Sequence, residues 1–299
     1  MTAVTLIIFN RPDTTRQVLD AIAKAKPTKL LVIADGPRPD RPGEMERCAA
    51  ARAIVGMVDW DCEVLTNFSN VNLGCGRRVA SGLDWVFSQV EESIILEDDC
   101  LPHSDFFLFC DSLLDRYREN TRIMAIGGAN FEPDHHWGDG SYYFSRNCYI
   151  WGWASWRRAW RHYDVDMRAL PGFLERLHEH LPVPAEARYW SQLFRTTREG
   201  RIDTWDYQWQ FAVMRTYGLT IVPNANLVSN IGFGPNATHT KDSNGRGAVM
   251  PVRALGGLRH PSDIACNELA DQHYFRIMHH RSFARRARDN LARGWRAFR

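Results

Sequence analysis

The sequence predicts an α/β fold with a mostly parallel sheet flanked by helices. Short apolar runs rich in β-branched residues alternate with segments of helical periodicity. Short connections join them, which favours right-handed crossovers between parallel strands. The 299 residues are 44% hydrophobic and 24% charged, a composition that excludes disordered and fibrous proteins.

Strand and helix alternate in the first part of the chain. Residues 4–9 form a continuous apolar run, as expected for a strand buried on both faces of a parallel, Rossmann-like sheet. Asp13 can cap the helix that follows, because apolar residues recur after it at helical spacing. The alternation continues with expected strands at 30–34, 63–68 and 93–96 and expected helices at 44–57 and 77–90.

Aromatic residues dominate the second part of the chain. A helix after Ser104 and a strand at 123–126 come first, and the segment 137–163 is then crowded with tryptophan and tyrosine. A further helix is expected from Trp205 to Tyr217, since Gly218 can end it. We therefore divide the chain into 1–128, an aromatic-rich part 129–262 with a glycine-rich mobile loop near 230–257, and a basic tail 263–299.

Polar residues follow three of the predicted strands. Arg11 comes after the first strand, Asp35 after the second, and Glu97-Asp98-Asp99 after the fourth. Ligands of parallel sheets bind beyond the carboxyl ends of the strands, so these residues should border one crevice.

The run Glu97-Asp98-Asp99 favours a metal site. Adjacent acids beside a buried strand cost free energy, because like charges repel and lose hydration, and a divalent cation would offset that cost. Side chains alternate along an extended chain, so one face of the run could hold a hard metal ion and the other a sugar or ribose hydroxyl. A solvated acidic turn, or a cap for the helix at Ser104, remains the alternative.

Basic and glycine-rich segments nearby suit an anionic ligand. Arg11, Arg77 and Arg78 are candidates for a diphosphate clamp, since guanidinium presents a rigid fork of donors to phosphate oxygens. The segment 72–76 reads Asn-Leu-Gly-Cys-Gly and leads into a helix, whose amide groups also favour anions. Surface arginines are common, so an ordinary surface role stays open for Arg77 and Arg78.

An acid among aromatic residues opens the predicted helix at 205–217. The segment reads Trp205-Asp206-Tyr207-Gln208-Trp209. An acid at a helix start is ordinarily an N-cap. Aromatic faces stack on sugar rings, however, and a carboxylate among them can accept a proton from an attacking hydroxyl. We favour a general base at Asp206 over a cap.

The basic tail and the net charge of the chain indicate which partners and which cellular location to expect. Phe283, Leu291 and Trp295 fall on one helical stripe surrounded by arginines, which is typical of an interfacial helix on anionic lipid and equally of a terminal helix packed on the body. A net charge of +2 argues against nucleic acid as a partner. Without a signal peptide, and with scattered cysteines, we expect a cytoplasmic protein, with peripheral contact to the inner face of the cell membrane left open.

These segments resemble the nucleotide-sugar half of GT-A fold glycosyltransferases. The resemblance covers 4–12, 33–35, 81–87 and 94–99 with the following Asp105-Phe106-Phe107, and it resumes at 149–153 and Trp205-Asp206. The sequence is similar to the N-acetylglucosaminyltransferase I family, whose metal motif is also Glu-Asp-Asp, and to bacterial family-2-like glycosyltransferases.

The resemblance implies an inverting, metal-dependent transfer of a hexosyl or N-acetylhexosaminyl group. The donor would be a nucleotide sugar, UDP-linked, and the acceptor a glycan, a lipid-linked glycan or another hydroxyl. Asp99 and His239 would bind Mn²⁺ or Mg²⁺. The remaining implied contacts are Asn10, Arg11, Asp35, Glu97 and Asp98 for the donor and Trp151, Trp153 and Trp205 on the acceptor side. Residues 1–128 would then bind the nucleotide sugar and 129–262 the acceptor.

Two features depart from the family pattern. The family uses a second aspartate after the tryptophan as its base, where this chain has Tyr207, so the base falls to Asp206. The Golgi anchor is missing, and an enzyme of surface polysaccharide synthesis fits better.

A sugar-phosphate nucleotidyltransferase is one alternative, although Asn10-Arg11-Pro12 is not the glycine-rich loop that this class has after its first strand. A catalytically silent nucleotide-sugar-binding or membrane-associated protein is another.

Overall fold

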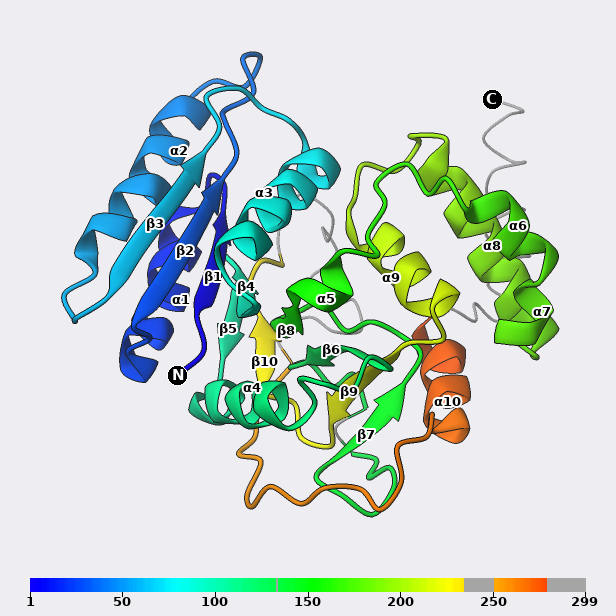
Figure 1. The fold of residues 1–299 in the computed structure, drawn as a ribbon. Coiled ribbons are helices and arrows are strands. Elements are labelled where there is room, and N and C mark those ends of the chain that lie inside the picture. Colours follow the sequence, from blue (N-terminus) through cyan, green and yellow to red (C-terminus); the bar gives the residue numbers. More distant parts are fainter. Residues whose placement is uncertain (133, 234–249, 279–299) are drawn as a thin grey trace, which may run out of the picture.

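The computed structural model describes residues 1–132, 134–233 and 250–278. Eight strands form one sheet in the order β3-β2-β1-β4-β8-β6-β9-β7 (Figure 1). Its strands are β1 Val4–Ile8, β2 Lys29–Ala34, β3 Glu63–Phe68, β4 Glu92–Glu97, β6 Ile123–Gly127, β7 Tyr142–Ser145, β8 Trp153–Trp156 and β9 Leu219–Pro223. A second, two-stranded sheet pairs β5 Cys100–Pro102 with β10 Val228–Asn230.

The predicted α/β fold with a mostly parallel sheet is confirmed. Strand β1 runs parallel to both β2 and β4, and Ile7 lies opposite Ile33 and Glu97, so the carboxyl ends of these strands meet at one edge. Strand β8 is antiparallel to β4 and β6, and β7 is antiparallel to β9. The sequence did not predict β7 and β8, which lie inside the aromatic-rich segment 137–163.

Helices cover both faces of the sheet. Along β1, Val4, Leu6 and Ile8 join the core that α1 and α4 complete, whereas Ile7 faces α3, α5 and α9. This alternation is what a strand buried on both faces requires. The helices are α1 Pro12–Ala25, α2 Glu44–Ala53, the 3-10 helix η1 Ile54–Met57, α3 Cys75–Gln89, α4 Ser104–Arg116, α5 Arg157–Trp160, α6 Leu170–Glu175, α7 Leu177–His180, α8 Pro184–Arg198, α9 Asp206–Arg215 and α10 Glu268–Met278.

The chain after β8 builds a separate helical layer. Helices α6, α7, α8 and α9 enclose their own apolar cluster, which includes Phe173, Trp190, Phe194 and Phe211. Figure 1 shows this layer beside the carboxyl-terminal part of the sheet, with α9 nearest to the strands. Helix α9 also packs on the sheet through Trp209, so the beginning of α9 is held at the edge of the sheet.

Helix α10 packs against the edge of the sheet at β7. Ala270 and Tyr274 on α10 contact Tyr143, Tyr149 and Val222. The amphipathic stripe predicted for the basic tail falls within 279–299, which lies outside the described residues, as does most of the predicted mobile loop, at 234–249. Among the residues that are described, no helix combines the length and the apolar character needed to cross a membrane.

Glu186 is a buried acid in the first turn of α8. Its side chain is 3% exposed, and its Oε1 atom has no hydrogen-bond partner in the described structure. Burial raises the pKa of Glu186 to about 7, an effect that Asp271 strengthens and the charge of Arg146 opposes. A carboxyl whose pKa is raised on folding destabilises the folded state once the pH exceeds the unfolded pKa, and the penalty is complete above the folded pKa.

We therefore expect Glu186→Gln to stabilise the protein at pH 8 and to have little effect near pH 4.5. Since one pKa unit corresponds to about 1.4 kcal/mol, the gain at pH 8 is at most about 3 kcal/mol. Thermal unfolding of both proteins between pH 4.5 and 8.5 measures it. Glu175→Gln, on an exposed residue of α6, is the control and should show no such dependence. A Glu186→Gln effect that is independent of pH would contradict the prediction.

Candidate active site

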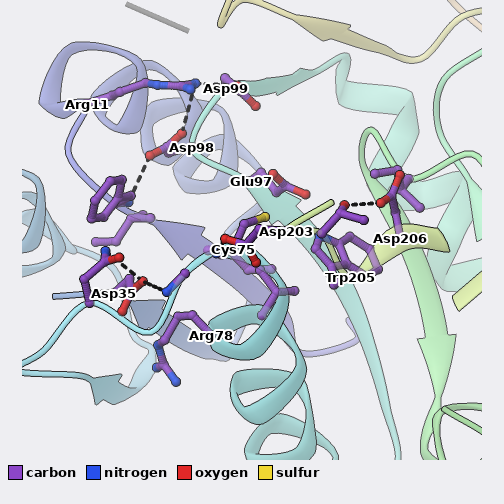
Figure 2. A pocket seen from close by; sticks show the side chains of 18 of the residues that line it. Arg11, Asp35, Cys75, Arg78, Glu97, Asp98, Asp99, Asp203, Trp205 and Asp206 are labelled. Atoms are coloured by element: carbon purple, nitrogen blue, oxygen red, sulfur yellow. Dashed lines mark hydrogen bonds and ion pairs between the residues drawn. The ribbon is translucent and has the colours of Figure 1, made fainter. Parts of the chain in front are cut away.

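A cleft of about 550 Å³ lies beyond the carboxyl ends of β1, β2 and β4 (Figure 2). It brings together Arg11, Asp35 and the run Glu97-Asp98-Asp99, as the order of the predicted strands implied. Its walls are parts of the segments 7–11, 35–38, 72–79, 97–99, 150–151 and 202–207, together with Asn230. Residues from both predicted parts of the chain thus share one cleft.

The acidic run is held in place by its neighbours in the sheet. Glu97 ends β4, and Asp98 and Asp99 form the turn into β5. Oδ2 of Asp98 accepts a hydrogen bond from the backbone N–H of Phe9 at 3.0 Å. Nη1 of Arg11 lies 2.5 Å from Oδ2 of Asp99 and 3.7 Å from Oδ1 of Asp98. The end of β1 therefore supplies both an amide donor and a cation to the acids at the end of β4.

Negative charge in this part of the cleft exceeds what Arg11 offsets. Burial and repulsion from Asp99 raise the pKa of both Glu97 and Asp98 well above the usual range, although Arg11 lowers them. Burial lowers the pKa of Arg11, but the charges of Asp98 and Asp99 outweigh that effect and raise it. A cluster with this imbalance favours the binding of an additional cation.

The carboxylates of the run do not form a complete metal cage by themselves. Within the described ranges, a set of three ligand atoms lying within 4.8 Å of one another is found only at Glu132, His135 and His273, away from the cleft. A hard cation at the acidic run would therefore take few ligands from the protein. Such a coordination sphere is typical of ions that also bind the phosphates of a substrate.

Strand β10 brings the backbone of the chain against the acidic run. The N–H of Ile231 donates to the carbonyl oxygen of Asp99 at 2.8 Å, and β10 pairs with β5 next to it. A Cβ atom on Gly232 would lie 2.1 Å from Oδ2 of Asp99 and 2.7 Å from Nη1 of Arg11. A larger residue at position 232 would therefore displace the side chains of Asp99 and Arg11. The predicted ligand His239 lies outside the described residues.

Asp35 holds the loop that enters the cleft. Its carboxylate accepts hydrogen bonds from the backbone N–H groups of Leu73 at 3.0 Å and Gly74 at 3.1 Å, and from Nδ2 of Asn72 at 3.1 Å. Burial raises the pKa of Asp35, while the backbone N–H groups of Leu73, Gly36 and Gly74 oppose the rise. Asp35 lines the cleft and also gives loop 72–74 its shape.

The predicted anion site at the start of α3 is already filled by the chain. Asp203, 128 residues away, accepts the N–H of Cys75 at 3.0 Å with Oδ2 and the N–H of Gly76 at 2.9 Å with Oδ1. The expectation that segment 72–76 would bind a substrate anion is thus corrected. A Cβ atom on Gly76 would lie 2.6 Å from the carbonyl oxygen of Thr204, so this glycine allows the close approach of segment 203–204.

Of the two arginines predicted as a clamp, Arg78 lines the cleft but Arg77 does not. Arg78 is 5% exposed and donates four hydrogen bonds within the protein, to Ala34 O, Ser81 Oγ and both oxygens of Asn67. It ties α3 to the ends of β2 and β3. Arg77 is exposed and does not line the cleft.

Another arginine, Arg38, lines the cleft. Its guanidinium lies 5.5 Å from the ring centre of Phe9, and its Nη2 atom is 2.5 Å from Oε1 of the buried Glu44. The predicted donor-binding residue Asn10 does not line the cleft, because its Nδ2 atom donates to the same Glu44 oxygen. Glu44 therefore organises the turns after β1 and β2.

Asp206 lines the cleft in the first turn of α9. The N-cap residue of this helix is Trp205, which makes no side-chain capping bond, and the hydroxyl of Thr204 donates to Oδ1 of Asp206. Asp206 is close enough to Glu97 for its negative charge to raise the pKa of Glu97. Figure 2 shows Asp206 and the acidic run on different parts of the same cleft.

The predicted acceptor-side tryptophans take different roles. Trp151 and Trp205 line the cleft, and Trp151 packs edge-on against Phe233. Trp153 is 1% exposed and stacks on Trp205 with 5.4 Å between ring centres. The expectation that Trp153 faces an acceptor is corrected: it is buried within β8 and packs against Trp205.

Several lining residues escaped the sequence analysis. They include Arg38, Ile202, Asp203 and Thr204. Arg38 follows the turn Asp35-Gly36-Pro37 and could have been found from the position of that turn after β2. Asp203 could not, because it caps a helix far away in the sequence.

Comparison with known proteins identifies no family. No protein-family model matches the sequence, and no curated protein matches it. In structure the chain is similar to mouse xyloside xylosyltransferase 1 in its apo form, with 9% identity over 72% of this chain and 82% of that one and a TM-score of 0.38.

Two further structures show similarity. A 4-diphosphocytidyl-2C-methyl-D-erythritol synthase from Anaerococcus prevotii is 13% identical over 52% of this chain and 71% of its own, with a TM-score of 0.34. A UDP-glucose pyrophosphorylase complexed with UDP-glucose is 9% identical over 53% of this chain and 70% of its own, with a TM-score of 0.30. These likenesses are loose, and the function proposed below depends on the residues of the cleft.

Proposed function

We propose that the protein is a metal-dependent, inverting glycosyltransferase. It would transfer a sugar from a UDP-linked donor to a hydroxyl group of a glycan or lipid-linked glycan. The observation that carries this proposal is the combination of acids in one cleft: Glu97-Asp98-Asp99 with Arg11 at the end of β4, and Asp206 among aromatic residues at the start of α9. The first group suits a diphosphate with its cation, and the second suits a sugar hydroxyl.

The residues at the end of β4 fit a hard divalent cation. Carboxylate oxygens are preferred ligands of Mn²⁺ and Mg²⁺. Burial, and then repulsion from Asp99, raise the pKa of Glu97 and Asp98, and a bound cation would oppose both effects. Asp99 is the proposed ligand. Such an ion, when bound, stabilises charge on a leaving nucleoside diphosphate. Arg11, beside Asp99, can direct its guanidinium donors to the same phosphate oxygens.

Asp206 is the proposed general base. It would accept the proton of the acceptor hydroxyl while the acceptor oxygen forms a bond to the anomeric carbon and the bond from that carbon to the diphosphate breaks. Asp203 lies in the same cleft but uses both carboxylate oxygens to cap α3. Tyr207, which is half-buried beside Asp206, can offer its ring to a sugar, whereas Trp205 is 2% exposed and stacks on Trp153.

A screen of nucleotide-sugar donors with Mn²⁺ tests the proposal. We expect release of UDP from one donor, suppression of that release by a chelator, and binding of Mn²⁺ weakened by more than about 100-fold in Asp99→Asn, because a direct ligand is lost. The acid variant Asp105→Asn, at the start of α4 and outside the cleft, is the matched control.

Three outcomes would contradict this assignment. Pyrophosphate released from a nucleoside triphosphate and a sugar phosphate would indicate a nucleotidyltransferase. Thermal stabilisation by UDP and Mn²⁺ without any turnover would indicate a silent binding protein. If Asp99→Asn retained the full Mn²⁺ dependence of the wild type, Asp99 would not be the metal ligand.

A further inference from the structure

Two histidines and a glutamate meet outside the cleft, between the loop after β6 and helix α10. Glu132 and His135 lie in that loop, and His273 lies on α10. One potential ligand atom from each residue lies within 4.8 Å of the other two. Nδ1 of His273 is 2.5 Å from Oε2 of Glu132, and the two imidazole centres are 4.6 Å apart. None of the three lines the cleft.

Glu132 has an unsatisfied oxygen in this cluster. Its side chain is 2% exposed. Oε2 accepts from His273 and from Nε1 of Trp137 at 3.2 Å, whereas Oε1 is buried and has no hydrogen-bond partner in the described structure. Such an atom costs free energy when it is left unpaired, and a bound cation is one way to satisfy it.

The ligands are held by packed and hydrogen-bonded elements. The N–H of Glu132 donates to Oδ1 of Asn130 at 2.7 Å, and the N–H of His135 donates to the carbonyl oxygen of Glu132 at 2.9 Å. Helix α10 is anchored by Asp271, which accepts from Arg146 and Ser145. Rigid support of this kind pre-organises a ligand set and lowers the cost of binding.

The spacing suits a tetrahedral ion. Ligand atoms about 2.0–2.1 Å from such an ion lie about 3.3 Å from one another. The observed distances, from 2.5 Å for His273 and Glu132 to less than 4.8 Å for the set, lie on both sides of that value. To bind such an ion, the pair of His273 and Glu132 would have to separate slightly and the exposed His135 to turn toward it; a water molecule can take the fourth position.

We propose that Glu132, His135 and His273 bind a divalent transition metal of the zinc class, which fastens α10 to the loop after β6. Imidazole nitrogen selects Zn²⁺ over Mn²⁺ and Mg²⁺, whereas carboxylate oxygen alone suits the harder ions. The site is therefore chemically distinct from the acidic run in the cleft. It does not depend on the function proposed for the cleft.

Titration of the metal-stripped, full-length protein with Zn²⁺ tests the site. Isothermal calorimetry and thermal unfolding should show a bound equivalent and a Tm raised by several degrees, because a ligand of the folded state stabilises it. His135→Ala should weaken this binding by more than about 100-fold. The neighbouring His136→Ala, on an exposed residue outside the set, should bind as the wild type does.

Two further measurements distinguish this site from the acidic run: the Tm of the metal-free His135→Ala variant and the Zn²⁺ affinity of a cleft variant. His135 is exposed, so His135→Ala should keep the Tm of the metal-free wild type, and Asp99→Asn should keep full Zn²⁺ affinity. The proposal is overturned if the wild type does not bind Zn²⁺, which would leave Glu132 and His273 as a simple ion pair. It is equally overturned if His135→Ala and His136→Ala bind Zn²⁺ alike, or if Mn²⁺ competes with Zn²⁺ at similar concentrations.

Discussion

Asp206→Asn is expected to slow sugar transfer by about 10²–10⁴-fold, the usual contribution of a general base. Asparagine keeps the size of the side chain and can still accept from Thr204, but it cannot take up a proton at neutral pH. Binding of UDP and Mn²⁺ should be unchanged, because Arg11 and Asp99, the residues proposed to contact the diphosphate and its cation, are not altered. Steady-state kinetics with the donor found by the screen, together with calorimetric titration of UDP, measure both effects.

Asp203→Asn is the matched control for this prediction. Asp203 lies in the same cleft, but both of its oxygens cap α3. Asparagine keeps one accepting oxygen and replaces the other by an NH₂ group, so one of the two N–H groups loses its acceptor. The free energy of unfolding should fall by about 0.5–1.5 kcal/mol, with a smaller effect on turnover. Should Asp203→Asn abolish transfer while Asp206→Asn remains active, the base would be Asp203.

Gly232→Ala is expected to reduce turnover by at least about 100-fold, the cost of displacing a reacting group by about 1 Å. The added Cβ atom would lie 2.1 Å from Oδ2 of Asp99 and 2.7 Å from Nη1 of Arg11, so these side chains or the segment that follows β10 must move. The affinity for Mn²⁺ and UDP should fall with the turnover. Circular dichroism should show an unchanged fold, because the clash is confined to the cleft.

Gly257→Ala provides the comparison for the glycine variant. Gly257 also lies in a loop, but a Cβ atom there would meet no atom within 4 Å. This variant should keep wild-type turnover and metal affinity. Equal activity of Gly232→Ala and the wild type would show that the close contact of Gly232 with Asp99 is not needed for catalysis.

Hydrophobic periodicity was enough to locate the first sheet strands. Strand β3 covers 63–68 as predicted, because it pairs at one edge of a parallel sheet and its neighbours are clear turns. The helix expected at 44–57 is instead α2 followed by the 3-10 helix η1. The short strands β7 and β8 were missed because four-residue runs of aromatic residues carry no periodicity that separates strand from loop.

The positions of the cleft residues could be predicted from the sequence, but the hydrogen-bond partners of their side chains could not. Position after a strand correctly placed Arg11, Asp35 and the acidic run together, since the carboxyl ends of parallel strands meet at one edge. Arg78, predicted from the affinity of guanidinium for phosphate, also lines the cleft, but its donors are used by Asn67 and Ala34 from neighbouring strands. Nothing in the local sequence indicates that these acceptors exist.

The sequence by itself determined the fold class, the edge of the sheet at which the cleft forms and the acids that follow β4, because strand order and period act locally along the chain. Only the tertiary structure decided which carboxylates are already occupied. Asp203 caps a helix 128 residues away, and His273 reaches Glu132 across 141 residues. Such pairs depend on how α3, α9 and α10 pack on the sheet, and packing of distant segments leaves no pattern in the sequence.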